Sequence, residues 1–432
     1  MVPSPHSLRL SAARRFRGRF TLPGDKSICH RLALLGALAE GETRVGNFSS
    51  AADCASTLEC LSLLGVTNKR AGSHVSIQGR GVGALTAPAT VLPAGNSGST
   101  LRMLAGILAG RPFRSTIAGD ASLNGRPVER VARPLRALGA HVETTDGKPP
   151  VTIQGAGLQG IEWTLEVASA QVKTAVLLAG LQASGTTTVR EPESTRDHTE
   201  RLLPAFGVEL TRAPGSVSVS GRDRPLTPLA WDAPGDASSA AFLVVAALIR
   251  PDSAVRVEGV LLNPLRTAFL DVLRSMGADV TWVTMSRDPE PVGWIEARTS
   301  RLQGVDVPPH LVPGLIDEVP ALAVAAAAAE GTTRVSGAAE LRVKESDRIA
   351  ALAEGLGRMG VAVTEQPDGL TIEGGRPWKG ASVRSRGDHR IAMALAVAAL
   401  GAEGDTELEG AECASVSFPE FYDVLRQAAA AP

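Results

Sequence analysis

The sequence has 432 residues, of which 44% are hydrophobic, and this composition excludes a disordered chain. At about 150 residues per domain, the length predicts two or three domains. Acidic and basic residues nearly balance, at 45 and 44, so the overall charge favours neither a nucleic acid nor a membrane as partner. An anion-binding site therefore needs a local cluster of arginine and lysine.

The cysteine content and the apolar runs indicate a cytoplasmic protein. The four cysteines are Cys29, Cys54, Cys60 and Cys413. They form no Cys-x-x-Cys pair, and we expect reduced thiols. Apolar runs such as Ala321–Ala329 are far shorter than the roughly 20 residues that span a bilayer. The arginine-rich N-terminus faintly resembles a transit peptide, but it has no apolar core, so we favour a strand there.

One pattern recurs roughly every 70 residues: a helical segment, a glycine and a short strand. Its five copies centre on Gly65, Gly139, Gly207, Gly277 and Gly360. Glycine suits the C-terminus of a helix, where the left-handed conformation costs it least. The alternating apolar residues that follow predict half-buried strands.

A second marker, a strand that ends in an apolar-x-small sequence, has the same period. Its six copies centre on Val45, Ile117, Val189, Val257, Val335 and Leu408. Any α/β protein repeats helix, glycine and strand, but two markers with one period favour six copies of one unit. We expect the helix Phe418–Ala430 and a strand pair within Ser7–Phe20 to complete the sixth copy.

Six units predict an α/β protein with two domains of three units each. The first domain would span residues 22–233, and the second would combine 1–21 with 234–432. Two connections, near residues 21 and 234, would form a hinge. We expect the active site in the cleft between the domains, where ligands commonly bind and where closure would exclude water.

Polar and basic residues gather where apolar helices begin. The sequence LPGDKSICHR places Lys26, Ser27 and Arg31 in the first turns of a helix, where backbone N–H groups favour anions. The loop GNSGSTLR places Gly98 before another helix, although an ordinary capped helix would have the same sequence. Arg126 lies in SLNGRPVER, where a solvated arginine is the alternative.

Two further helix starts follow in the same half of the chain. SAQVK contains Ser169 and Gln171, which suit recognition of hydroxyl and phosphate groups, although Ser169 could simply cap the helix. TRDHTE places Arg196 before the next helix.

Acidic residues join the basic ones in the second half. Asp317 precedes an apolar helix, a place where acidic residues are also common for structural reasons. GDHRIAMA places His389 and Arg390 before another apolar helix, and we interpret the histidine as structural.

The run LRVKESDR is the densest charged segment. It contains Lys344, Glu345, Asp347 and Arg348 between apolar neighbours. A charged surface helix would explain it equally well.

Together these segments resemble the 3-phosphoshikimate 1-carboxyvinyltransferase (EPSP synthase) family over essentially the whole chain. LPGDKSxxHR, GNxGxxxR, SAQVK, IDE, LRVKESDR and DHRIAMA stand in the family's order and rough spacing. The resemblance implies two inverse α/β barrel-like domains, each built from three repeated β/α units. It also implies a monomeric enzyme without a cofactor, which acts in the shikimate pathway of aromatic amino acid biosynthesis.

The implied reaction transfers the enolpyruvyl group of phosphoenolpyruvate to the 5-hydroxyl of 3-phosphoshikimate and releases phosphate by addition–elimination. The residues implied for 3-phosphoshikimate are Lys26, Ser27, Arg31, Ser169, Ala170, Gln171, Arg196, Asp317 and Lys344. Those implied for phosphoenolpyruvate are Lys26, Gly98, Arg126, Gln171, Arg348 and Arg390. The implied catalytic residues are Asp317 as the base for the 5-hydroxyl, Glu345 as the proton donor to the methylene carbon, and Lys26.

The sequence departs from the better-studied bacterial branch at one position. That branch has a lysine ahead of a Phe-Pro near its C-terminus, where this chain has Val416. SAQVK and TRDHTE resemble the branch that includes glyphosate-tolerant enzymes. Gly98, however, leaves room for that inhibitor, so tolerance does not follow from the sequence.

Two rival functions are less consistent with these residues. A UDP-N-acetylglucosamine enolpyruvyl transferase would have Lys-Asn in place of Lys26-Ser27, and a reactive cysteine in a stretch where this chain has none. A non-enzymatic anion-binding protein would not need Asp317 and Glu345. The seven histidines are scattered without ligand spacing, so we expect no metal.

The chemistry sets a condition on Glu345. Protonating an enol carbon requires a carboxylic acid whose pKa is raised toward neutrality. Lys344 and Arg348 would lower the pKa of Glu345, and only bound substrate anions and closure could raise it again. We therefore expect Glu345 to donate its proton mainly in the loaded site.

Replacing Glu345 tests this role. Glu345→Gln removes the transferable proton but keeps the shape of the side chain, and we expect turnover to fall about 10²–10⁴-fold. Steady-state kinetics measures the loss. Near-normal turnover would exclude Glu345 as the proton donor.

Overall fold

A computed structural model describes residues 7–430 and shows two compact units. The N-terminal unit consists of Pro23–Pro234 and Asp288–Glu290; the C-terminal unit consists of the chain up to Leu22, Gly235–Arg287 and the chain from Pro291 onward. The chain therefore crosses between the units four times. Two crossings lie near the connections that the sequence predicts, and two enclose the short segment Asp288–Glu290.

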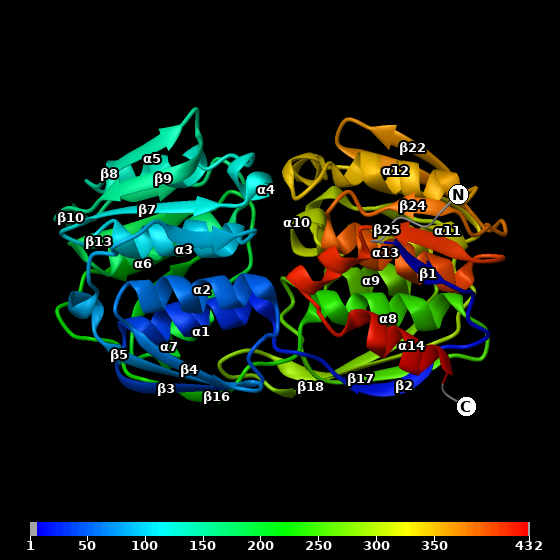
Figure 1. The fold of residues 1–432 in the computed structure, drawn as a ribbon, viewed down its shortest axis with the longest axis horizontal. Helices are drawn as coiled ribbons and strands as arrows, with labels where there is room; N and C mark the ends of the chain where they lie inside the picture. Colours follow the sequence, from blue (N-terminus) through cyan, green and yellow to red (C-terminus); the bar gives the residue numbers. More distant parts are fainter. Residues whose placement is uncertain (1–6, 431–432) are drawn as a thin grey trace. The chain divides into compact units, whose positions relative to one another are not determined.

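Three helices form the core of the N-terminal unit: α1 (Lys26–Leu38), α3 (Gly98–Leu108) and α6 (Ala170–Gly180). Almost all of their residues beyond the first turn are buried, and α3 packs against both α1 and α6. A helix that is apolar on all sides belongs in a core. Figure 1 shows these helices enclosed by the sheets of their own unit.

Three four-stranded sheets cover this core, in the orders β16-β3-β5-β4, β6-β7-β9-β8 and β11-β13-β15-β14. The strands of the first sheet are β3 (Glu40–Gly46), β4 (Thr67–Ala71), β5 (His74–Arg80) and β16 (Ala230–Asp232). The second contains β6 (Leu92–Gly95), β7 (Arg114–Gly119), β8 (His141–Thr145) and β9 (Lys148–Gln154). The third contains β11 (Glu162–Thr164), β13 (Thr186–Arg190), β14 (Leu210–Ala213) and β15 (Ser216–Ser220). The remaining helices are α2 (Ala52–Leu63), α4 (Ala121–Asn124), α5 (Glu129–Ala137) and α7 (His198–Ala205).

The C-terminal unit repeats this plan. Its core helices α8 (Ala237–Ile249), α11 (Val319–Ala328) and α13 (His389–Gly401) are buried along their length and pack against one another. The first sheet contains β2 (Arg17–Thr21), β17 (Ala254–Leu261), β18 (Asp279–Ser286) and β19 (Val292–Arg298). The second contains β20 (Asp306–Val307), β21 (Gly331–Val335), β22 (Ala362–Gln366) and β23 (Gly369–Gly374). The third contains β1 (Ser7–Leu10), β24 (Ser382–Arg384) and β25 (Thr406–Glu409). The other helices are α9 (Ala268–Ser275), α10 (Val312–Leu315), α12 (Arg348–Arg358) and α14 (Phe421–Ala430).

Both repeat markers are confirmed. All five marker glycines have positive φ, between +76° and +114°. They are Gly65, Gly139, Gly207, Gly277 and Gly360. The six apolar markers lie on β3, β7, β13, β17, β21 and β25, each of which pairs with a parallel strand of its own sheet. The α/β fold of repeated units is thus the predicted one.

The expected N-terminal strand pair is wrong in one respect. β1 pairs with β25 in the sixth unit, whereas β2 pairs with β17 in the fourth. The two strands do not form a hairpin because the segment between them crosses from one sheet to the next, anchored by buried Ala13 and Phe16. The last helix begins at Phe421, three residues later than expected.

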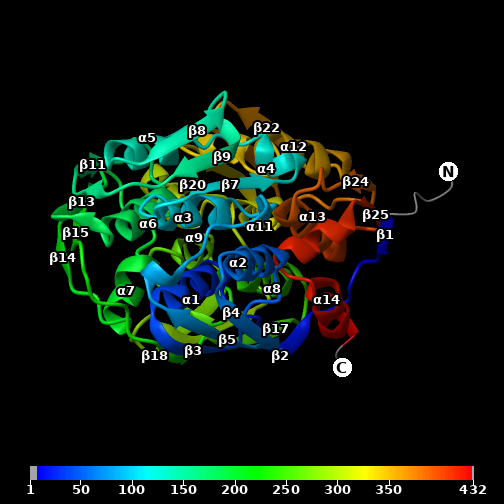
Figure 2. The same cartoon turned by 60° about the vertical axis from the view of Figure 1, so that its left-hand side comes forward.

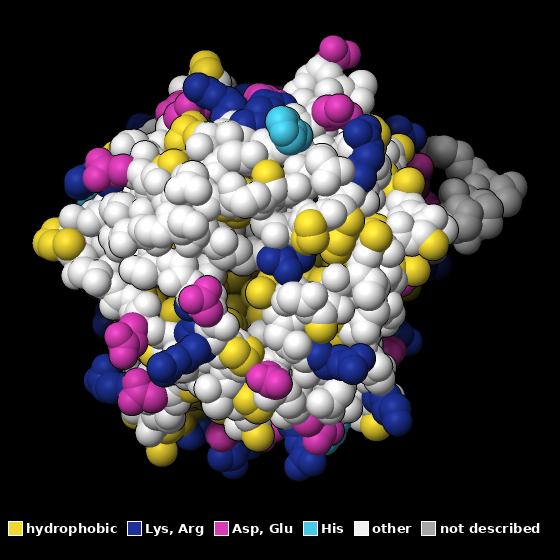
Figure 3. All heavy atoms as spheres, turned by 90° about the vertical axis from the view of Figure 1, so that its left-hand side faces the viewer, with side chains coloured by type: hydrophobic (Ala, Val, Ile, Leu, Met, Phe, Trp, Pro, Cys, Tyr) yellow, Lys and Arg dark blue, Asp and Glu magenta, His cyan; other side chains and the backbone are white. Residues whose placement is uncertain are grey.

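Acidic and basic side chains are interspersed over the face of the molecule in Figure 3, as the balanced composition predicts.

Among residues 7–430 no single helix has the length and apolar character to cross a membrane. The bent pair Pro309–Leu315 and Val319–Ala328 would be long and apolar enough, judged by length and composition alone.

The sixth unit offers a test of the packing. Leu408 is fully buried and lies on β25, the central strand of the sheet β1-β25-β24. Leu408→Ala should lower the free energy of unfolding by about 2–5 kcal/mol, because the cavity adds to the lost burial. Urea unfolding measures the change. The matched control is Glu409→Gln on the exposed face of the same strand, with an expected change within about 0.5 kcal/mol. A loss below about 1 kcal/mol for Leu408→Ala would contradict this packing.

Candidate active-site residues

Lys26 is the first residue of α1 and is held by an acidic partner. Asp25 caps the helix, its carboxylate accepting the backbone N–H of Ile28 at 3.0 Å. Lys26 Nζ lies 2.8 Å from Oδ2 of Asp53 on α2, and the two side chains are 15% and 9% exposed. The ion pair places a charged ammonium beside the N-terminus of α1, a position that favours an anion.

Arg31, one turn further along α1, is buried in a network of hydroxyl groups. Its Nε donates to Thr199 Oγ1 at 2.8 Å, and its Nη2 donates to Thr174 Oγ1 at 2.9 Å. Its Nη1 donates to the carbonyl of Ser27 at 2.9 Å, which connects two predicted site residues. Figure 2 shows α7, which contains Thr199, beside α1.

Burial lowers the pKa of Arg31 to about 10, while the charges of Glu200, Asp25 and Glu290 act to raise it. The guanidinium is therefore protonated at neutral pH. A charged group kept in a dry environment binds a phosphate more strongly than one exposed to water.

Gly98 begins α3 and lies beside two arginines. A Cβ at this position would come within 2.6 Å of Nη1 of Arg102 and 3.8 Å of Nη1 of Arg126. Arg126 is buried and donates to Asn96 Oδ1 at 2.6 Å and to Ser122 Oγ at 3.1 Å. Because Gly98 has no side chain, the guanidinium groups of Arg102 and Arg126 can lie close to its backbone.

Gln171 lies in the first turn of α6, where Ser169 caps the helix and Ala170 is its first residue. Its amide group is held from both sides: Arg102 Nη1 donates to Oε1 at 2.8 Å, and Nε2 donates to Ser99 Oγ at 2.9 Å. The N-terminal unit thus joins the starts of α3 and α6 through polar side chains.

In the C-terminal unit, Asp317 lies just before α11 among three cations. Its Oδ1 is 3.3 Å from Nη1 of Arg348, 3.6 Å from Nζ of Lys344 and 3.8 Å from Nε of Arg390. Arg390 also donates to the backbone carbonyl of Asp317 at 3.0 Å. The structure therefore brings together four predicted site residues that are up to 73 positions apart in the sequence.

Arg348 is the centre of this cluster and is only 1% exposed. Its Nη2 donates to Oε2 of Glu345 at 2.6 Å, and its Nε donates to Oδ2 of Asp388 at 2.8 Å. Burial alone would lower the pKa of Arg348, but the carboxylates of Asp388, Glu345 and Asp317 raise it above its usual value. Arg348 thus joins the carboxylates of Glu345, Asp388 and Asp317 in one cluster.

The alternative of a charged surface helix for LRVKESDR is wrong. Residues Lys344–Ser346 lie outside any helix, and Asp347 caps α12, which begins at Arg348. Arg348 is buried rather than solvated because the carboxylates of other segments surround it.

Several supporting residues were not assigned to the site from the sequence, although Arg102 and Asp388 lie within the motifs GNSGSTLR and GDHRIAMA. Asp53 holds Lys26, Arg102 holds Gln171, and Thr199 holds Arg31. Asp388 joins Arg348 to the start of α13, where it caps the N–H of Arg390. Asp388 was visible in the DHR sequence, but nothing in the sequence connects Asp53 or Thr199 with their partners.

One group with spacing suited to a metal lies in the described part of the chain, in the N-terminal unit. Ligand atoms of Asp197, His198 and Glu290 lie within 4.8 Å of one another. No sequence pattern indicates this group, since Glu290 is 92 residues from His198. Arg201 lies 2.8 Å from Asp197 and 3.8 Å from Glu290, so the group already contains a cation.

The fold of three buried helices within three sheets, present twice, is that of an enolpyruvyl transferase. The crystal structure of the enolpyruvyl transferase NikO from Streptomyces tendae superimposes with a TM-score of 0.78, covering 98% of this chain and 97% of that one. At 19% identity this similarity shows the fold alone.

Closer relatives define the family. The chain belongs to the EPSP synthase (3-phosphoshikimate 1-carboxyvinyltransferase) family, whose model matches residues 10–425. It is 51% identical over 428 residues to the 3-phosphoshikimate 1-carboxyvinyltransferase of Synechococcus sp. (strain JA-3-3Ab), with 97% of this chain and 96% of the relative covered. The protein of that name from Pelotomaculum thermopropionicum is 50% identical, with 97% and 98% covered. The structure of EPSP synthase from Acinetobacter baumannii is 44% identical, has a TM-score of 0.87 and covers 98% of both chains.

The Arg102–Gln171 contact leads to a test of the N-terminal residues. Arg102 also donates to the carbonyl of Pro127 at 3.1 Å, and a lysine cannot reproduce this planar pair of donors. Arg102→Lys should lower kcat/KM about 10-fold for each substrate, which corresponds to the loss of one charged hydrogen bond.

Arg111→Lys provides a matched control in the same unit. Arg111 Nε donates to Gln182 Oε1 at 2.9 Å, beyond the C-terminal ends of α3 and α6. We expect its kcat/KM to stay within about twofold of the unmodified protein. Equal losses in both variants would show general loosening of the helix pair and contradict a specific role for Arg102.

Proposed function

We propose that this protein transfers the enolpyruvyl group of phosphoenolpyruvate to the 5-hydroxyl of 3-phosphoshikimate, with release of phosphate. The single observation that supports this reaction most strongly is the position of Asp317, whose carboxylate lies within 4 Å of Lys344, Arg348 and Arg390. An ordinary anion site offers cations alone. Acid–base chemistry on bound anions needs both signs of charge in one place.

The proposed substrates explain the number of cations. Together they bring two phosphates and two carboxylates, whose repulsion must be offset by fixed positive groups. Arginine suits most of these positions because its planar fork matches both anions. We propose that the residues of both units act on one pair of substrates, with the assignments that the family motifs imply.

The reaction then proceeds in two stages. In the addition, the oxygen of the 5-hydroxyl bonds to C2 of phosphoenolpyruvate while Asp317 accepts the hydroxyl proton. Glu345 protonates C3, which becomes a methyl group. In the elimination, the bond from C2 to the phosphate oxygen breaks, and the proton that Asp317 accepted leaves with the phosphate. Glu345 removes a proton from the methyl group to restore the double bond. Lys26, Arg126 and Arg390 stabilise the negative charges throughout.

The cysteines argue against the UDP-N-acetylglucosamine reaction, which would use a reactive thiol. Cys54 and Cys60 are fully buried. Burial raises the pKa of Cys60 to about 12 and also places the pKa of Cys54 well above its ordinary value. Neither thiol forms a nucleophilic thiolate at neutral pH.

We also propose that the enzyme works as a monomer in the cytoplasm. All four cysteines are free, as is usual in a reducing compartment. Light scattering of the purified protein checks the monomer, since a stable dimer would double the measured mass.

One assay tests the proposed reaction. Phosphate release is measured with phosphoenolpyruvate and either 3-phosphoshikimate or UDP-N-acetylglucosamine as acceptor. We expect release with the first acceptor only. No release with 3-phosphoshikimate would exclude the proposal, and release with the nucleotide sugar would favour the rival reaction.

A further inference from the structure

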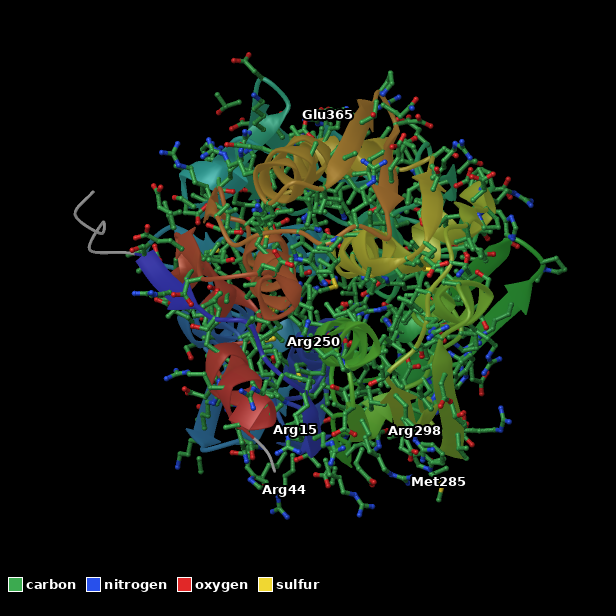
Figure 4. All side chains as sticks on the ribbon, turned by 90° about the vertical axis from the view of Figure 1, so that its right-hand side faces the viewer. Arg15, Arg44, Arg250, Met285, Arg298 and Glu365 are labelled. Atoms are coloured by element: carbon green, nitrogen blue, oxygen red, sulfur yellow. The ribbon has the colours of Figure 1, made fainter. Side chains whose placement is uncertain are left out.

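The turn between β18 and β19 contains a buried carboxylate that the proposed reaction does not use. Both strands belong to the C-terminal unit, whereas Asp288–Glu290 in the turn belongs to the N-terminal unit. Figure 4 shows Met285 and Arg298 at the surface on these strands. Met285 is 74% exposed, but Glu290 is fully buried. A buried carboxylate is costly unless it is paired, so its partners define its role.

The main partner of Glu290 is His198, the first residue of α7. Glu290 Oε1 lies 2.8 Å from His198 Nδ1, and both side chains are fully buried. Arg201, on the next turn of α7, lies 3.8 Å from Glu290. Glu290 therefore holds the first turns of α7 by hydrogen bonding and by charge.

The same turn of α7 holds the buried cations of the N-terminal unit. Thr199 accepts from Nε of Arg31 at 2.8 Å and lies 2.6 Å from the hydroxyl of Thr174. Glu200 lies 2.5 Å from Nζ of Lys173, which is completely buried. Consecutive residues of α7 thus contact Glu290, Arg31 and Lys173, and a displacement of this turn would move the guanidinium of Arg31.

The charges of Arg196 and Glu290 both act on Arg31. Besides burial, which is the largest effect, the charge of Arg196 acts to lower the pKa of Arg31 and the charge of Glu290 acts to raise it. Arg196 lies two residues before the start of α7, so the first turn of α7 also positions the backbone of Arg196.

We propose that Glu290 is a positioning residue for 3-phosphoshikimate, which acts through His198 and the first turn of α7 to hold Arg31 and Arg196. This inference rests on the proposed function, because it takes these two arginines to bind that substrate. The proposal gives a function to the segment Asp288–Glu290, which belongs to the same unit as His198.

The positioning role and a simple charge effect predict opposite results. If Glu290 only opposed the substrate phosphate, its neutralisation would tighten 3-phosphoshikimate binding. If it positions α7, neutralisation weakens binding, because Glu290→Gln has nearly the same shape but loses the charge-assisted hydrogen bond to His198 and the attraction to Arg201. The direction of the change therefore distinguishes the two.

The experiment measures the affinity of the full-length protein for 3-phosphoshikimate alone by calorimetry, together with steady-state kinetics. For Glu290→Gln we expect affinity to fall about 10-fold, the loss of roughly one charged hydrogen bond, with kcat and the KM for phosphoenolpyruvate within about twofold. His198→Gln should give a similar loss, and the double variant should lose little more than either single one, because the two residues form one contact.

Glu296→Gln is the matched control, since Glu296 lies on β19 of the same hairpin and pairs at the surface with Arg298 and Arg256. We expect its 3-phosphoshikimate affinity to be unchanged. A tenfold loss in this variant would mean that any disturbance of the hairpin is sufficient, and would overturn the specific role of Glu290.

Four other results would overturn the proposal. Two concern Glu290→Gln: unchanged or tighter binding of 3-phosphoshikimate, or equally weakened binding of both substrates. The others are failure of both single variants to fold, and a change in the 3-phosphoshikimate affinity of the unmodified protein on addition of Zn²⁺ or EDTA. The last would assign Asp197, His198 and Glu290 to a metal. Phosphate release by the unmodified protein tests the proposed function separately. Release together with an unaffected Glu290→Gln variant rejects the positioning role alone.

Discussion

The cost of burying a guanidinium group explains much of this structure. Arg348 is 1% exposed and Arg31 is 4% exposed, and neither could remain charged there without partners. Arg348 is neutralised by Glu345, Asp317 and Asp388, whereas Arg31 is hydrogen-bonded by hydroxyl groups and a carbonyl. Each arrangement fixes the cation in one geometry and requires several segments of chain to meet at that point.

The arrangements around Arg31 and Arg348 suit different functions. Arg31 is held by the hydroxyl groups of Thr174 and Thr199, which contribute no opposing charge. The carboxylates around Arg348 instead hold a nearly balanced cluster, in which an arriving anion competes with Glu345 for the guanidinium. In the proposed reaction, this competition connects substrate binding with the release of Glu345 as the proton donor.

The repeated fold provides the meeting points. In each unit three buried helices lie within three sheets, and side chains at or just before the starts of these helices contact one another. Exposed backbone N–H groups at helix starts favour anions, so a plan that gathers several starts is suited to phosphorylated ligands. Polar residues there cost little stability because they also cap the helices, as Ser169 and Asp388 do.

The sequence by itself determined the period of the fold, the helices and strands of each unit, and the candidate residues at the helix starts, because these depend on local patterns of apolar residues, glycines and caps. Only the tertiary structure decided which residues hold them: Asp53 beside Lys26, Thr199 beside Arg31 and Glu290 beside His198. It also separated the N-terminal strands into two sheets. Such pairings join distant segments, and their energies depend on burial and distance, neither of which is encoded in any short stretch of sequence.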